Sequence, residues 1–368
     1  MRIFRCGQCG QALYFENVSC LRCGSLLAFL PDQLDLGVIT PDSAGRPGLW
    51  HAQGQDYRLC LHRTQTQSCN FAIPAHDPQG LCASCRLTLV LPDLSVPGNF
   101  SRWFRLESAK RRLFFTLAQL RLLDGDPAGA STPRQAPGFK FLADLPGQPA
   151  ITGHDAGVIT INIGEADDDE RARRQAALHE PYRTVLGHLR HESGHFYWDQ
   201  LIAKGPALER FRQQFGDERA NYARALTQHY ERDPGRIDWQ AAHVSAYATA
   251  HPWEDWAETW AHYLHMVDLV DTANSFGTRI ELPGAGSIGA RDPAIVMSRS
   301  PDAKAFGFEQ MVRQWVPLTI LVNSLNRSLG QDDAYPFALS PAALDKLRFV
   351  HEVVSDAAKA SPASPGAP

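Results

Sequence analysis

Apolar side chains recur at helical spacing in several stretches of the chain. Between residues 100 and 125, Trp103, Leu106, Leu113, Leu117 and Leu120 fall near one side of a helix, which predicts a buried stripe. Residues 157–163 read GVITINI, and their β-branched side chains predict a strand. Further helices are predicted from about 181 to Gly205-Pro206 and over about 207–232, 252–270, 302–329 and 341–357.

These patterns divide the chain into four regions. Residues 1–95 form a cysteine-rich head, and residues 96–138 form a helical connector followed by a linker rich in Pro, Gly and Ala. Residues 139–358 form a larger body. The tail over 359–368 reads KASPASPGAP, and we expect it to be disordered because it cannot bury enough apolar surface.

Composition and charge indicate an ordinary globular protein. The formal charge of −4 offers no general attraction to nucleic acid or to anionic lipid. We find no apolar signal core before Cys6 and no apolar run of membrane-spanning length. We therefore expect a cytoplasmic protein without a membrane partner.

All eight cysteines lie between Cys6 and Cys85. In a reducing compartment, cysteine pairs at CxxC spacing are more often metal ligands than disulfides. The first cluster consists of two such pairs, each followed by a glycine that permits a tight turn. Four thiolates complete a tetrahedral structural zinc site, here assigned to Cys6, Cys9, Cys20 and Cys23.

The second cluster is less regular. Cys82 and Cys85 are a true CxxC pair, but Cys60 and Cys69 are separated by eight intervening residues. We predict a second structural zinc site of four cysteines, with His62 or His76 as an alternative to one of them.

The head carries seven Arg, no Lys and seven acidic residues, so it has no net positive charge with which to bind phosphate groups. A protein partner is therefore expected for the ribbons, and nucleic acid is not.

Residues 191–195 read His-Glu-Ser-Gly-His, which matches the pattern HExxH. Residues four apart lie on one face of a helix, so His191 and His195 can bind the same zinc ion. Glu192 lies beside them, placed to accept a proton from water at the metal. His188 shares that face, and we interpret it as a packed or orienting histidine.

Catalytic zinc needs a third protein ligand. Pro252 suits the first turn of a helix, and Glu254 and Glu258 then lie one turn apart on the same face. One carboxylate could bind zinc while the other orients a ligand histidine. The alternative is an amphipathic helix with its tryptophans buried and its acids in solvent.

The HExxH motif with a downstream glutamate resembles the gluzincin metallopeptidases. The segment 254–258 is closer still to the corresponding helix of lethal-factor-type enzymes, in which a tyrosine seven positions before the ligand assists catalysis. That resemblance implies that Glu254 is the third zinc ligand, that Glu258 orients a ligand histidine, and that Tyr247 donates to the developing oxyanion.

At full length the chain resembles the bacterial family of zinc-binding metallopeptidases with an N-terminal zinc ribbon. The resemblance runs through Cys69-Asn70, residues 81–87, 92–94 and 107–113, the HExxH helix and residues 253–260. It adds little about the substrate, because the family is defined largely by these motifs.

The expected fold is α+β: two small N-terminal zinc ribbons followed by a zincin-like metallopeptidase domain. The strand over 157–163 is expected at the sheet edge, where an extended peptide pairs. The chain would bind three zinc ions, one catalytic and two structural, and would hydrolyse peptide bonds of a peptide or protein with Glu192 as general base. The alternative is a catalytically weak zincin that acts as a protein-binding adaptor through its ribbons.

Overall fold

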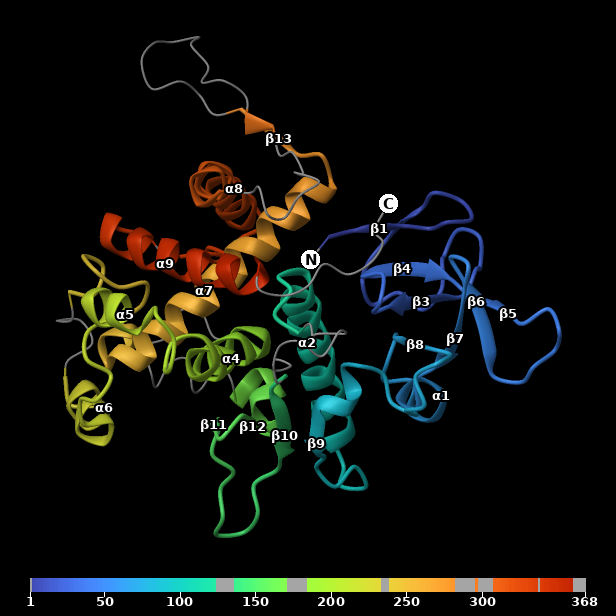
Figure 1. Cartoon of the computed structure of the whole chain (residues 1–368), viewed down its shortest axis with the longest axis horizontal. Coiled ribbons are helices and arrows are strands. Elements are labelled where there is room, and N and C mark those ends of the chain that lie inside the picture. Colours follow the sequence, from blue (N-terminus) through green and yellow to red (C-terminus); the bar gives the residue numbers. More distant parts are fainter. Residues whose placement is uncertain are drawn as a thin grey trace.

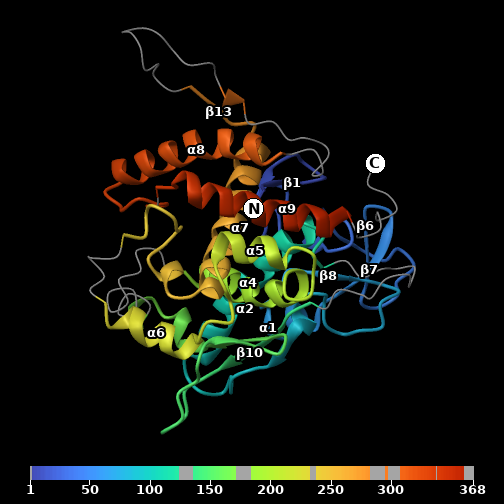
Figure 2. The same cartoon turned by 60° about the vertical axis from the view of Figure 1, so that its left-hand side comes forward.

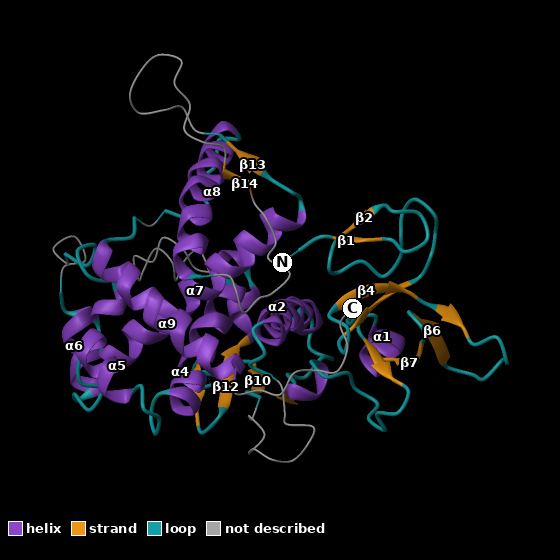
Figure 3. Ribbon diagram, turned by 45° about the horizontal axis from the view of Figure 1, so that its top comes forward, coloured by secondary structure: helices purple, strands orange, loops and turns teal. Residues whose placement is uncertain are grey.

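The computed structural model describes residues 2–123, 136–170, 184–232, 238–281, 295–296, 307–336 and 338–359. Most of the predicted linker, the predicted helix start near Pro181 and nearly all of the predicted tail lie outside these residues. The described part contains a head of short strands and a body of helices with a four-stranded sheet, and the long helix α2 (Asn99–Gln119) lies between them (Figure 1). A separate strand pair in the body joins β13 (Arg279–Ile280) to β14 (Ile295–Val296). Figure 3 shows the strands of the head apart from the helices of the body.

The head is built from short antiparallel pairings around the cysteines. One sheet has the order β5-β6-β7-β8, and two further pairs join β1 to β2 and β3 to β4. The elements are β1 (Phe4–Arg5), β2 (Ala12–Leu13), β3 (Leu27–Leu30), β4 (Asp35–Val38), β5 (Thr40–Pro41), β6 (Leu49–Ala52), β7 (Gln55–Leu59), α1 (Leu61–Thr66) and β8 (Ala72–Pro74).

A cluster of phenylalanines fixes the head to α2. The ring of Phe115 lies 5.4 Å from that of Phe15 and 5.7 Å from that of Phe29, centroid to centroid, and both contacts are tilted or edge-on. Such aromatic contacts add about 0.5–1.5 kcal/mol each beyond the area that they bury. The other members of the cluster are Phe4, Phe71 and Phe114.

The opposite face of α2 belongs to the core of the body. Trp103 and Leu106 are fully buried there, together with Trp256 and Trp260 of α7 (Pro252–Ser275). The stripe predicted for this helix is buried at Trp103, Leu106, Leu113 and Leu117, whereas Leu120 follows the end of α2 and is half-buried. Because α2 contributes to both cores, it is a shared structural element as well as a connection between them.

The sheet of the body has four strands in the order β11-β12-β10-β9. β10 is parallel to both of its neighbours, and β11 is antiparallel to β12. The strands are β9 (Thr88–Val90), β10 (Gly138–Leu142), β11 (Gly153–Asp155) and β12 (Val158–Asn162).

The predicted strand over 157–163 is β12, but its expected place at the sheet edge is wrong. β12 lies between β11 and β10, and β11 forms the edge on this side. The reason is a tight turn in which Ala156 and Gly157 adopt φ values of 46° and 84°. This turn folds β11 back along β12.

Six helices of the body surround or extend this sheet among the described residues, and α7 is central to them. α4 packs on α7 from one side, while α8 and α9 pack on it from the other (Figures 1 and 2). The helices are α4 (Val185–Leu201), α5 (Leu208–Phe215), α6 (Tyr222–Tyr230), α7, α8 (Phe308–Ser328) and α9 (Pro341–Lys359). None of them is long and apolar enough to cross a membrane.

The single helix predicted over 207–232 is in fact two, α5 and α6. Gly216 ends α5 with φ of 100°, a conformation that residues with a side chain rarely adopt. A Cβ at this position would also lie 3.2 Å from Cγ of Pro252. The chain therefore turns at Gly216, and α6 begins after the capping residue Asn221, whose side chain accepts a hydrogen bond from the backbone of Arg224.

Candidate metal centre and cysteine sites

Two histidines of α4 and one glutamate of α7 meet inside the body. Nε2 of His191 lies 3.1 Å from one carboxylate oxygen of Glu254, and Nε2 of His195 lies 3.6 Å from the other. All three residues are buried, and their ligand atoms lie within 4.8 Å of one another. The four-residue spacing of the histidines places both rings on the α7 side of α4, as the sequence predicted.

These donors fit a zinc ion. Two imidazole nitrogens and a carboxylate are a ligand set that proteins use for catalytic zinc, with bonds of about 2.0–2.2 Å. Ligand atoms around a tetrahedral ion of that size lie about 3.3 Å apart, and the 3.1 Å between Nε2 of His191 and Oε2 of Glu254 is close to this value. Burial alone would raise the pKa of Glu254, but the two histidines outweigh it and hold that pKa well below its usual value. A carboxylate binds zinc in its ionised form, which this lowered pKa favours.

Glu258 contacts the far nitrogen of the first histidine. Its Oε1 lies 2.7 Å from Nδ1 of His191, one helical turn along α7 from Glu254. The hydroxyl of Ser245 donates a hydrogen bond to Oε2 of Glu258 at 2.6 Å. This arrangement fixes the ring so that Nε2 faces Glu254. Ser245 has no motif around it, and the sequence analysis did not find it.

Close contact between α4 and α7 brings the two halves of the centre together. A Cβ on Gly194 would lie 2.9 Å from Cα of Ala257, so only glycine permits this approach. The indole nitrogens of Trp256 and Trp260 donate hydrogen bonds to the carbonyl of Gly194 and to the hydroxyl of Ser193. The two central residues of HExxH therefore hold the helices together.

His188 lies one turn before the motif and does not join the three ligand residues among the described part of the chain. Its Nδ1 lies 3.5 Å from Oε2 of Glu165, which follows β12. The interpretation of His188 as a packed or orienting histidine agrees with this position.

Two tyrosines approach the centre from the chain between α5 and α7. The hydroxyl of Tyr222 donates a hydrogen bond to Oε1 of Glu254 at 2.6 Å. The ring of Tyr247 lies 5.9 Å from that of His191. Tyr222 was missed in the sequence, since it precedes Glu254 by 32 residues and belongs to no motif.

An aromatic ring and a strand flank the second histidine. Trp253 lies against His195 with ring centroids 4.0 Å apart. His154, on the edge strand β11, contacts Phe196, the neighbour of His195, at 6.1 Å between ring centroids. The open edge of the sheet therefore runs beside the helix that carries the histidines.

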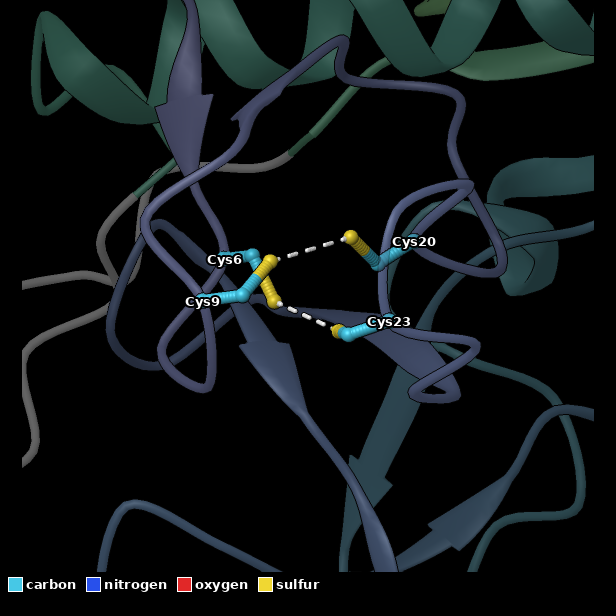
Figure 4. A group of neighbouring side chains, drawn as sticks. All are labelled: Cys6, Cys9, Cys20 and Cys23. Atoms are coloured by element: carbon cyan, nitrogen blue, oxygen red, sulfur yellow. Dashed lines mark hydrogen bonds between the residues drawn. The ribbon is translucent and has the colours of Figure 1, made fainter.

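The first four cysteines surround one point. Figure 4 shows their sulfurs turned toward each other, with Cys6 3.7 Å from Cys23 and Cys9 3.6 Å from Cys20. A disulfide would hold two sulfurs about 2.05 Å apart, whereas thiolates at the corners of a zinc tetrahedron are about 3.8 Å apart. Gly10 and Gly24 make equivalent turns, each with φ of 72°, so the two CxxC pairs have the same backbone geometry.

The second four cysteines form a similar but fully buried group. The sulfur of Cys69 lies 3.8 Å from that of Cys82 and 3.6 Å from that of Cys85. The backbone of Cys82 donates a hydrogen bond to the sulfur of Cys60 at 3.4 Å, a contact that stabilises a thiolate. The group contains no histidine within the described residues, so the alternatives His62 and His76 are not part of it.

The sequence comparisons agree with this architecture. A family described as "Putative zinc-binding metallo-peptidase" matches residues 99–353, and a zinc-ribbon domain matches residues 3–96. Uncharacterized proteins of Mycobacterium tuberculosis and Mycobacterium bovis are 40% identical to the chain over 365 residues, which cover 97% of this chain and 96% of theirs. No solved structure matches. The chain, with two four-cysteine sites ahead of a buried His-His-Glu centre, belongs to this zinc-binding metallopeptidase family.

Proposed function

We propose that the protein is a zinc-dependent peptidase of the gluzincin type that hydrolyses peptide bonds. The observation that carries the proposal is the convergence of His191, His195 and Glu254, with Glu192 directly after His191 in the sequence of α4. Zinc held by the three ligands would lower the pKa of a bound water molecule and polarise the carbonyl of the scissile bond.

Glu192 is the general base in this proposal. It follows His191 on α4 and is buried. It would accept the proton of the attacking water and pass it to the leaving amine. A protein that used the metal only for structure would have no need of this carboxylate.

Two further residues would assist the hydrolysis of the peptide bond. Glu258 holds the His191 ring through Nδ1, which keeps Nε2 available as a ligand. Tyr247 would donate a hydrogen bond to the oxyanion that develops on the scissile carbonyl, and its position beside the His191 ring supports that role.

We further propose three zinc ions per chain, one catalytic and two structural. The donor sets and the distances between sulfurs support this count. All eight cysteines are free thiols in the structure, which suits a reducing compartment and supports a cytoplasmic location.

The ribbons would bind a protein partner or present a protein substrate. Leu21, at the tip of the second CxxC turn, is 94% exposed, and Tyr14 is 69% exposed. These two side chains would be available to a protein partner. The same feature supports the competing function, an adaptor that retains the metal but has little activity.

A peptide-library digest separates the two functions. Zinc-loaded wild type should cleave a subset of peptides, and Glu192→Gln, purified in parallel, should not, although its zinc content and thermal stability should match. Equal cleavage by both proteins would assign the activity to a contaminant and overturn the proposal. Absence of cleavage by both, with capture of a partner through the head, would favour the adaptor.

A further inference from the structure

Helix α6 reaches the metal centre through a single side chain. No residue of α6 is buried, and Tyr222 itself is 38% exposed. Its hydroxyl nevertheless makes a 2.6 Å hydrogen bond to Glu254, which is 1% exposed. A helix that lies on the surface thus places one polar atom against a buried ligand carboxylate.

The position of Tyr222 is fixed by the residues on both sides. His251 caps α7 by accepting a hydrogen bond from the backbone of Trp253, and its other ring nitrogen bonds the carbonyl of Ala220 at 3.1 Å. Asn221 caps α6. The ring of Tyr222 packs edge-on against those of His251 and Trp253, at 5.2 Å and 6.0 Å. The start of α6 is therefore tied to the start of α7, where Glu254 lies.

We propose that Tyr222 is a positioning residue that orients the carboxylate of Glu254 for zinc, an inference that rests on the metal site of the proposed function. A carboxylate that binds an ion through one oxygen needs a hydrogen-bond donor for the other, and residues in that position tune metal affinity. A tyrosine hydroxyl remains protonated up to about pH 10, so it is a lasting donor. It donates to Oε1, which lies 3.6 Å from Nε2 of His195, while Oε2 lies closer to a ligand histidine, at 3.1 Å from Nε2 of His191.

Tyr247 has a different place in the centre. Tyr222 gives its only proton to Glu254, whereas Tyr247 lies with its ring beside that of His191. Removing the Tyr247 hydroxyl leaves the bond to Glu254 in place. The two tyrosines should therefore affect different measured quantities: Tyr222 the affinity for metal, and Tyr247 the rate of turnover.

The test measures zinc affinity at the catalytic site by competition with a chromogenic chelator, in full-length protein that keeps zinc in both cysteine sites. Tyr222→Phe should weaken this affinity about 10–100-fold, the usual effect of losing such a partner. Tyr247→Phe and Tyr230→Phe should leave it within about twofold. Tyr230 lies at the other end of α6 and is 57% exposed, so it controls for the loss of a hydroxyl from this helix.

A second readout uses cobalt at the catalytic site. Loss of the donor frees Oε1 to bind the ion as well, and the visible absorption of Co²⁺ weakens when its coordination number rises. Unchanged affinity and an unchanged spectrum in Tyr222→Phe would overturn the inference, as would equal losses in all three variants. Neither measurement depends on peptide cleavage. If the wild type cleaves no peptide but Tyr222→Phe still weakens zinc binding, the proposed peptidase function is wrong and the inference about Tyr222 stands.

Discussion

Glu258 lies 2.7 Å from Nδ1 of His191, on the side of the ring away from Glu254. Its replacement by glutamine should weaken the acceptor and loosen the ring. We expect Glu258→Gln to lower the zinc affinity of the catalytic site about 10–100-fold while the cysteine sites stay loaded. Metal analysis after dialysis against increasing chelator concentrations would measure both.

The matched control for this change is Glu309→Gln. Glu309 is an exposed residue that pairs with Arg348 at the surface. Both variants lose one negative charge, but only Glu258 contacts a ligand. Equal zinc affinities in the two variants would show that zinc binding by His191 does not depend on its contact with Glu258.

Zinc content should distinguish the three sites. Wild type purified without chelator should contain close to three ions per chain, and His191→Ala should contain close to two. Cys82→Ser should lose a structural ion and destabilise the head, because structural zinc contributes on the order of 10 kcal/mol to small modules. Disulfides found by mass spectrometry, with about one zinc per chain, would contradict the assignment of the cysteines.

Tyr247→Phe tests the donor to the oxyanion. The ring is retained and only the hydroxyl is lost, so fold and metal content should be preserved. We expect kcat to fall about 100-fold or more, the usual effect of losing one such donor. Glu254→Ala, by contrast, should lose the catalytic metal itself. Full turnover by Tyr247→Phe on a cleaved peptide would remove this residue from the mechanism.

Gly194→Ala should separate the two halves of the metal centre. The added Cβ would lie 2.9 Å from the backbone of α7, so the helices must move apart. We expect a loss of about 1–3 kcal/mol in the free energy of unfolding and weaker catalytic zinc binding. Chemical denaturation and chelator competition would measure these effects. Gly307→Ala, where a Cβ meets nothing within 4 Å, should change zinc binding little.

Phe115→Ala tests the contact between the head and α2. Phe115 is fully buried among the phenylalanines of the head, so truncation should reduce the free energy of unfolding by about 3–5 kcal/mol. Phe104→Ala removes the same side chain from a position on α2 that is 39% exposed, and should have a much smaller effect. Similar losses in both variants would mean that the cluster adds little beyond ordinary helix packing.

The parts of the centre that the sequence indicated are those fixed by local geometry. The positions of His191 and His195 follow from four-residue spacing on a helix, and those of Glu254 and Glu258 from the helix that Pro252 opens. The cysteine groups could be predicted for the same reason, since each CxxC pair sets its own turn. The structure brings these residues together, and their roles remain as proposed above.

The missed residues are positioned by contacts between distant segments. Tyr222 meets Glu254 only because the chain turns at Gly216 and runs back along the start of α7. A glycine followed by Asp217 was a signal for a helix end that the prediction of one long helix overlooked. The place of β12 in the sheet was missed because alanine rarely occupies the left-handed conformation that Ala156 adopts in the turn before it.

The phenylalanine cluster has a consequence for how a partner would reach the metal. Because α2 contributes to the core of the head and to that of the body, the head is packed against the body through this helix. The backbone of Ile3 adds a second attachment through its hydrogen bond to Ser275, at the end of α7. A protein bound by the ribbons would therefore lie at a set distance from the metal centre. The cleavage point would then be set by the length of chain between the held segment and the scissile bond.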